Sequence, residues 1–240
     1  MKIIQNNNSS KNKVTLIGAV HGDEFFGRTV FNNFAKHIDA YPGLTLILAN
    51  TEALSLRRRG VDSDLNRSFP GSANGNHEER LAHQLLKVID PASYVIDIHT
   101  TPNSDGFVPI VTNLSHGTKY IINQLPARNI VYMQSGFGSL IGQFRQSISL
   151  EYHYKYCRGN LVIKEIEKII ANILSHENNT KKLRSIFTCN DRIPASVPIP
   201  KNAQSFERIS GLDIIPFLPR YRARRGYKGF VLSEPKEIMI

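Results

Sequence analysis

The stretch that decides the fold is residues 14–24, VTLIGAVHGDE. Its first seven residues form a short apolar run rich in β-branched side chains and bounded by polar residues, which is typical of a buried β-strand. Over residues 24–38 the apolar side chains recur at helical spacing, so we expect a helix directly after this strand. A strand that leads at once into a helix predicts a βαβ unit.

The same alternation continues along the chain. We expect further strands at residues 44–49, 94–98, 107–112, 130–133 and 147–151. We expect further helices at residues 77–89, 118–125 and 161–174, the first with Asn76 as its N-cap. Strands that alternate with helices predict an α/β fold, with a mixed, mostly parallel sheet flanked by helices.

After about residue 180 the character of the sequence changes. Six prolines interrupt short strand-like runs at residues 186–188, 213–215 and 229–232. We therefore expect two domains: an α/β domain over residues 1–180 and a small C-terminal β-rich domain over residues 181–240. The second is short for an independent hydrophobic core.

Composition excludes several classes of protein. No apolar run approaches 18 residues, so we expect no transmembrane helix and no membrane partner. The N-terminus turns polar at once, unlike a secretory signal. Two cysteines, Cys157 and Cys189, do not make a disulfide framework, and reduced thiols in a cytoplasmic protein are expected.

The formal net charge of +10 has two interpretations. It could favour nucleic acid, but the basic residues are scattered apart from residues 57–59 and the arginines of 220–225. A basic–aromatic ladder and zinc-finger spacing are both missing from the sequence, so we expect no nucleic-acid partner. An electropositive cleft that attracts small anions fits equally well. The sequence is compatible with a homo-oligomer and does not decide it.

Two short segments offer candidate metal ligands. His21-Gly22-Asp23-Glu24 follows the first strand, and His99 ends the strand at residues 94–98. Two histidines and one glutamate make a catalytic zinc set that leaves a position for water. Ligands in open α/β sheets bind at the carboxyl ends of strands, so the three side chains converge if these two strands are neighbours.

Two further features add to this set. The pair Asn66-Arg67, within Asp64-Leu65-Asn66-Arg67, can hold a carboxylate. Asp97 shares a strand face with His99, and it either orients that imidazole or is a polar residue at the rim of the sheet. The combination predicts a metal-dependent hydrolase that acts on a small anionic substrate.

These motifs together resemble the succinylglutamate desuccinylase/aspartoacylase family, within the zinc carboxypeptidase clan. The resemblance rests on motifs that occur in order over residues 14–175: His21-x-x-Glu24, Arg59, Asp64-x-Asn66-Arg67 before Phe69-Pro70-Gly71, and Asp97-x-His99-Thr100-Thr101. It implies a carboxypeptidase-like α/β domain and a smaller C-terminal β domain that shapes the substrate entrance. It also implies one zinc ion per chain, held by His21, Glu24 and His99.

The resemblance assigns roles to other residues as well. Arg59 matches the arginine that polarises the scissile carbonyl, and Asn66 and Arg67 match the pair that grips the substrate's α-carboxylate. Glu151 matches the catalytic glutamate at a strand end, which takes a proton from zinc-bound water and delivers it to the leaving amine. One departure from the family pattern follows Glu151. Residues 152–156 read YHYKY, where relatives tend to have small residues or glycine, so the size and specificity of the acyl pocket stay open.

The family also uses a tyrosine from its C-terminal part, for which Tyr221 and Tyr227 are the candidates. Both lie in a basic surface loop, where a tyrosine more often serves packing than chemistry. The sequence thus predicts a zinc-dependent deacylase that cleaves the amide bond of a small anionic N-acyl amino acid. A zinc metallocarboxypeptidase acting on peptides and a non-catalytic metal- or anion-binding relative remain alternatives. Neither the acyl group nor the amino acid follows from the sequence.

Overall fold

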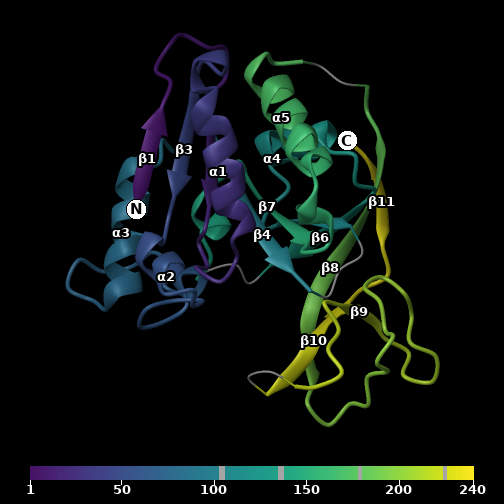
Figure 1. Ribbon diagram of the computed structural model, residues 1–240. Helices are drawn as coiled ribbons and strands as arrows, with labels where there is room; N and C mark the ends of the chain where they lie inside the picture. Colours follow the sequence, from purple (N-terminus) through teal and green to yellow (C-terminus); the bar gives the residue numbers. More distant parts are fainter. Residues whose placement is uncertain (103–105, 135–137, 178–179, 224–225) are drawn as a thin grey trace.

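A computed structural model describes residues 1–102, 106–134, 138–177, 180–223 and 226–240. In these residues eleven strands form one sheet, in the order β1-β3-β2-β4-β7-β5-β6-β8-β10-β9, with β11 paired to β8 (Figure 1). The strands are β1 (Lys2–Gln5), β2 (Val14–Gly18), β3 (Leu44–Leu48), β4 (Tyr94–Thr101), β5 (Phe107–Val111), β6 (Asn129–Met133), β7 (Ser147–His153), β8 (Leu183–Pro194), β9 (Ile215–Phe217), β10 (Tyr227–Leu232) and β11 (Lys236–Met239).

The centre of this sheet is mostly parallel, as the sequence predicts. β3, β2, β4 and β7 run parallel to one another, and so do β5, β6 and β8. The antiparallel pair β5–β7 joins the two parallel groups. The remaining pairings, of β1 at one edge and of β9, β10 and β11 at the other, are antiparallel.

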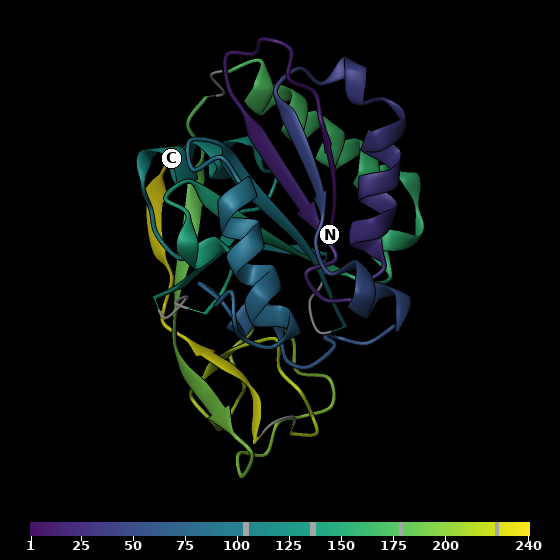
Figure 2. The same cartoon turned by 90° about the vertical axis from the view of Figure 1, so that its left-hand side faces the viewer.

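Helices cover both faces of the sheet (Figure 2). The α-helices are α1 (Phe26–Lys36), α2 (Thr51–Ser55), α3 (His77–Val88), α4 (His116–Gln124) and α5 (Asn160–Leu174). Short 3-10 helices are η1 (Ile38–Ala40), η2 (Leu65–Arg67), η3 (Ile141–Gln143) and η4 (Tyr156–Arg158). Apolar residues of α1, α4 and α5 belong to one core cluster, whereas those of α3 belong to a second.

The alternation of side chains along the strands separates these two cores. In β2, Leu16 packs with the α1 side and Ile17 with the α3 side, since successive side chains of a strand point to opposite faces. Helix α1 lies directly against β2. The approach is so close that a Cβ atom at Gly18 would be 2.5 Å from the Gly27 carbonyl oxygen. This close approach fixes the turn between β2 and α1.

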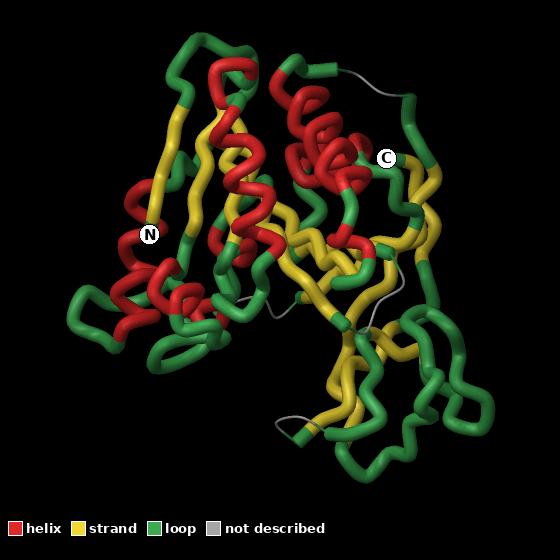
Figure 3. The backbone as a smooth tube through the Cα atoms, in the orientation of Figure 1, coloured by secondary structure: helices red, strands yellow, loops and turns green. Residues whose placement is uncertain are grey.

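The sheet continues into the C-terminal region. β8 begins beside β6 and extends for 12 residues, and its far half pairs with β10, which in turn pairs with β9 (Figure 3). The sequence predicts only residues 186–188 of this strand, and it misses β1 altogether. One sheet therefore runs through both parts of the chain, and the domain boundary near residue 180 stays a prediction.

No helix in the described part of the chain has the length and apolar character needed to cross a bilayer.

Candidate active site

The predicted metal ligands and the predicted catalytic glutamate lie at the carboxyl ends of three adjacent strands. β4 lies between β2 and β7, so the strands that precede His21 and carry His99 are neighbours. In the parallel pairing of β4 with β7, His99 lies opposite Glu151. This is the edge at which open α/β sheets bind their ligands.

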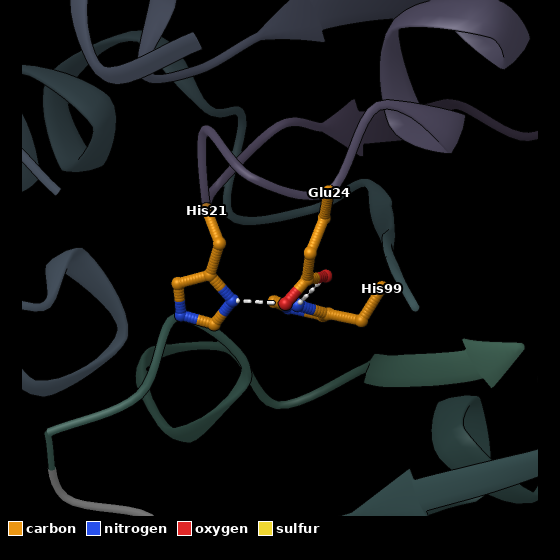
Figure 4. A group of neighbouring side chains, drawn as sticks. All are labelled: His21, Glu24 and His99. Atoms are coloured by element: carbon orange, nitrogen blue, oxygen red, sulfur yellow. Dashed lines mark hydrogen bonds and ion pairs between the residues drawn. The ribbon is translucent and has the colours of Figure 1, made fainter. Parts of the chain in front are cut away.

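The side chains of His21, Glu24 and His99 point toward one another (Figure 4). Glu24 lies between the two imidazoles: its Oε1 is 2.7 Å from Nδ1 of His21, and its Oε2 is 3.0 Å from Nδ1 of His99. Ligand-type atoms of the three residues all lie within 4.8 Å of one another. Both imidazoles are buried, with 3% and 2% of their surfaces exposed.

A carboxylate holds the opposite nitrogen of each imidazole. Nε2 of His21 lies 3.1 Å from Oδ1 of Asp64, and Nε2 of His99 lies 2.6 Å from Oδ2 of Asp97. A carboxylate that accepts a hydrogen bond from Nε2–H leaves the Nδ1 lone pair for a cation. The sequence left the role of Asp97 open and gave none to Asp64, and the structure places both against the two histidines.

The charges around the imidazoles favour an added positive charge. Burial opposes ionisation of Glu24, but His99 and His21 outweigh it and lower the pKa of its carboxyl group. Burial likewise disfavours a charged His99, but Asp97 and Glu24 raise the pKa of its imidazole well above the ordinary value. Oδ1 of Asp97 is buried and has no hydrogen-bond partner in the described residues. A proton or a metal ion can supply the positive charge that these carboxylates favour.

Arg59 joins this centre through Asp64. Its Nε donates to Oδ2 of Asp64 at 2.9 Å, and its Nη1 lies 3.6 Å from Oε1 of Glu24. Burial opposes the ionised carboxylate of Asp64, but His21 and Arg59 lower the pKa of that carboxyl group far below its usual range. One carboxylate thus holds both a candidate metal ligand and the arginine predicted to polarise the carbonyl.

The backbone brings the His21 turn and Arg59 together. The amide of Gly22 donates to the carbonyl oxygen of Arg59 at 3.2 Å. A Cβ atom at Gly22 would lie 2.1 Å from the carbonyl carbon of Ala53, so only glycine allows this approach.

Asn66 and Arg67 lie in η2, directly after Asp64, which contacts His21 and Arg59. Oδ1 of Asn66 accepts a hydrogen bond from the backbone amide of Leu140 at 2.8 Å. Arg67 is exposed, and its Nη1 donates to the carbonyl oxygen of Asn66 at 2.6 Å. Both residues line the cavity that contains the centre. The structure therefore brings the predicted carboxylate clamp to the cavity that His21 and Glu24 also line.

A buried glutamate from α3 fastens the loop that carries Arg59 and Asn66. The carboxylate of Glu78 accepts hydrogen bonds from the backbone amides of residues 61, 62 and 63 at 2.6–2.9 Å, and from Nδ2 of Asn50 at 3.0 Å. Burial opposes its ionisation, but these donors outweigh burial and lower the pKa of Glu78. Sequence analysis missed this residue, since it looks like any charged residue in the first turn of a helix.

Glu151 lies in β7 opposite His99, and it lines the same cavity as His21 and Glu24. Burial raises the pKa of its carboxyl group, and the negative charge of Glu24 adds to this effect while His99 opposes it. A carboxyl group with a raised pKa can both accept and return a proton near neutral pH.

The cavity has a volume of about 710 Å³ and reaches into the C-terminal region. Tyr227 lines it, whereas Tyr221 is 54% exposed, lies beneath the ammonium group of Lys201 and is outside the described lining. Of the YHYKY stretch, Tyr154 lines the cavity and Tyr152 is buried in the core. Arg224 and Arg225, in the basic run around the two candidate tyrosines, lie outside the described residues.

Residues 10–136 match the family model of the succinylglutamate desuccinylase/aspartoacylase catalytic domain. The chain belongs to the succinylglutamate desuccinylase/aspartoacylase family. It is 28% identical over 116 residues to a probable aspartoacylase of Trichodesmium erythraeum, which covers 42% of this chain and 40% of that protein. It is 32% identical over 106 residues to an N-alpha-acetyl-L-2,4-diaminobutyric acid deacetylase of Halomonas elongata, which covers 41% of this chain and 31% of that protein.

Solved structures share the fold over nearly the whole chain. Succinylglutamate desuccinylase from Chromobacterium violaceum superposes with a TM-score of 0.72 at 14% identity, covering 97% of this chain and 86% of that one. Murine aminoacylase 3 superposes with a TM-score of 0.66 at 16% identity, covering 97% and 98%. These likenesses support the mixed, mostly parallel α/β architecture that the sequence predicts.

Proposed function

We propose that this chain is a zinc-dependent amidohydrolase that cleaves the amide bond of a small N-acyl amino acid. One observation carries the proposal: Nδ1 of both His21 and His99 faces Glu24, while Asp64 and Asp97 hold the opposite nitrogens. Two histidines and one glutamate form a zinc set that leaves room for water and substrate. The family to which the chain belongs supports the same reaction class.

The donor set fits a divalent cation, because buried carboxylates surround the two imidazoles and Oδ1 of Asp97 has no partner in the described residues. We propose His21, Glu24 and His99 as the residues that would hold one zinc ion. When bound, zinc supplies Lewis acidity, which lowers the pKa of water and polarises a carbonyl group.

Other residues supply the remaining chemistry in this proposal. Glu151 takes a proton from the attacking water and delivers it to the leaving amine, for which a raised pKa is suited. Arg59 donates to the oxygen on which negative charge develops. Asn66 and Arg67 hold the substrate carboxylate, which a guanidinium can bind with two parallel hydrogen bonds.

Glu151→Gln is the variant that tests the proposal. We expect amine release from a panel of N-acyl amino acids to fall by about 10²–10⁴-fold, because the proton carrier is lost, with zinc still bound at one ion per chain. Glu207→Gln, at an exposed position in the C-terminal region, is the matched control and should retain turnover.

The same panel, extended with short peptides, separates the alternatives. Cleavage of peptides alone would assign the chain as a metallocarboxypeptidase. Stoichiometric zinc without turnover of either substrate class would contradict the proposed substrate and favour a binding protein. Full activity of Glu151→Gln would contradict the proposed role of Glu151.

A further inference from the structure

The cavity extends away from the candidate metal ligands along one face of the sheet. From Glu151 in β7 it crosses β5, β6, β8, β10 and β9, which are consecutive neighbours in the sheet. Each of these five strands places an apolar side chain in its lining. We call these side chains the apolar trough: Ile110, Met133, Cys189, Phe230 and Phe217.

Strand pairing places these side chains on one face of the sheet. Ile110 lies opposite Ser149 of β7, two residues before Glu151 on the same face. Met133 lies opposite Cys189, and Phe230 opposite Phe217. Leu232, the partner of Cys189, lies two residues after Phe230 on the same face of β10. The trough therefore follows one face of the sheet and begins near the candidate catalytic glutamate.

The floor is apolar and firmly packed. Ile110 and Phe217 are buried in a core cluster, and Met133, Cys189 and Phe230 pack against that cluster while partly exposed. Burial, with the nearby Asp191, raises the pKa of the Cys189 thiol to about 11, so this side chain is uncharged at neutral pH.

Charged residues lie farther out, where the cavity meets the C-terminal loops. Asp191 and Arg192 are exposed residues of β8, and Arg220 also lines the cavity. The guanidinium of Arg192 lies over the ring of Tyr227, 4.9 Å from its centroid. Arg192 lies opposite Phe230 in the β8–β10 pairing, so a charged residue borders the outer end of the apolar floor.

The trough starts on the side of Glu151 where the carboxylate clamp lies. Leu140 donates its amide to Asn66, and a Cβ atom at Gly138 would lie 3.1 Å from the Arg67 carbonyl oxygen. One residue further on, the carbonyl oxygen of Ile141 accepts from the hydroxyl of Thr112 in the cavity lining, at 3.2 Å. The clamp and the trough therefore share one wall, made by residues 138–141.

This arrangement determines which part of an N-acyl amino acid faces the trough. The α-carboxylate and the side chain are attached to the same carbon atom, so a carboxylate held by Asn66 and Arg67 leaves the side chain within reach of the shared wall. We propose that the amino acid released by this enzyme carries a bulky apolar side chain, aliphatic or aromatic, which lies in the apolar trough. The inference rests on the proposed amidohydrolase function and names the substrate class of that site.

Turnover of N-acetyl-L-alanine, -leucine, -phenylalanine and -aspartate tests the proposal. We expect kcat/KM for the leucine and phenylalanine substrates to exceed that for alanine by roughly tenfold or more, because each added methylene gains from burial. The aspartate substrate should fall below alanine, since its carboxylate would lose water against an apolar floor. A higher kcat/KM for aspartate than for leucine would overturn the proposal.

Met133→Lys tests whether the trough causes the preference. A charge in the middle of the floor should remove the advantage of leucine and phenylalanine and should raise kcat/KM for aspartate. Met239→Lys, at a methionine that is 62% exposed on β11, is the matched control and should keep the wild-type order. Met133→Gln serves if the lysine variant does not fold. An unchanged order in a folded Met133 variant would overturn the proposal.

A series of N-acyl-L-leucines with acetyl, butyryl and hexanoyl groups tests the orientation. We expect no gain in kcat/KM as the acyl chain lengthens. A steady rise with acyl length, without a dependence on the amino-acid side chain, would place the acyl group in the trough and overturn the assignment.

Calorimetric binding of free L-leucine, L-phenylalanine and L-aspartate to the zinc-loaded protein separates the two proposals. Tighter binding of leucine and phenylalanine than of aspartate would support the trough, provided that Met133→Lys removes this difference. If that result is obtained but no N-acyl amino acid is hydrolysed, the amidohydrolase proposal is contradicted and the trough is not. Turnover with no preference for apolar side chains in either measurement would leave the function in place and overturn the trough.

Discussion

At the scale of single residues, Asp64 connects parts of the site that are far apart in the chain. Its two carboxylate oxygens contact Nε2 of His21 and Nε of Arg59, at 3.1 and 2.9 Å. A carboxylate on the outer nitrogen of a histidine ligand orients the ring and raises its basicity. Asp64 therefore couples the candidate metal site to the arginine proposed to stabilise the developing oxyanion.

The change Asp64→Asn tests this coupling. We expect zinc affinity to fall by about 10–100-fold, because an amide lacks the charge that holds His21 and Arg59. Competition with a chelator measures the affinity. Asp62→Asn is the matched control in the same loop, since Asp62 is exposed and contacts the amide of His77 rather than the site. Equal zinc affinity in wild type and Asp64→Asn would contradict the role of this carboxylate.

At the scale of elements, the long segment between α2 and α3 owes its shape to α3. Glu78 of α3 gathers three consecutive backbone amides of this segment on one carboxylate, a few residues from Arg59 and Asn66. Asn76 and Glu79 form a capping box that fixes the start of the same helix. The geometry of the clamp therefore depends on where α3 begins.

The change Glu78→Gln tests this dependence. We expect the free energy of unfolding at pH 7 to fall by about 1–3 kcal/mol, because an amide cannot accept the same four hydrogen bonds. Urea unfolding measures this loss. Glu79→Gln on the next residue is the matched control, because glutamine also completes a capping box and should leave stability nearly unchanged.

The loss in Glu78→Gln should depend on pH. The pKa of Glu78 is lower in the folded protein than its ordinary value of 4.5, so its charge stabilises the fold above about pH 4.5. This stabilisation is lost as the pH falls through the folded value. The difference between wild type and Glu78→Gln should therefore narrow in acid, and a constant difference would contradict the proposed cause.

At the scale of the whole molecule, the apolar core clusters contain none of the candidate metal ligands. The core clusters consist of apolar residues on both faces of one sheet, while the candidate ligands lie at its edge. We therefore expect the zinc-free protein to fold, and zinc to add stability by binding the folded state alone.

Thermal unfolding with zinc and with a chelator tests this expectation. A free zinc concentration near 100 times Kd adds about 2.7 kcal/mol, which raises Tm by roughly 5–10 °C for a chain of this size. His99→Ala should abolish the rise, because it removes one candidate ligand. His116→Ala, at an exposed histidine of α4, should retain it. The same rise in His99→Ala would place the zinc elsewhere.

Much of this architecture could be predicted from the sequence, because local patterns encode it. The apolar run before His21 predicts β2, and the spacing of Phe26, Val30 and Phe34 predicts α1, since burial on one face leaves a period in the sequence. The structure starts α1 two residues later than predicted, because Glu24 turns inward to the two histidines. β1 leaves almost no pattern, as it has only two apolar residues and pairs at the edge of the sheet.

The sequence by itself determined the α/β class, the family and the candidate chemical residues, because periodicity and motif spacing are properties of neighbouring residues. Only the tertiary structure decided which carboxylate holds which imidazole. Asp64 lies 43 residues from His21, so no local pattern pairs them. For Asp97 the sequence offered two interpretations, and the structure places its carboxylate against His99. The apolar trough is likewise assembled from five strands whose adjacency no local pattern encodes. Contacts between distant segments depend on the order and register of strands, which the whole chain settles together.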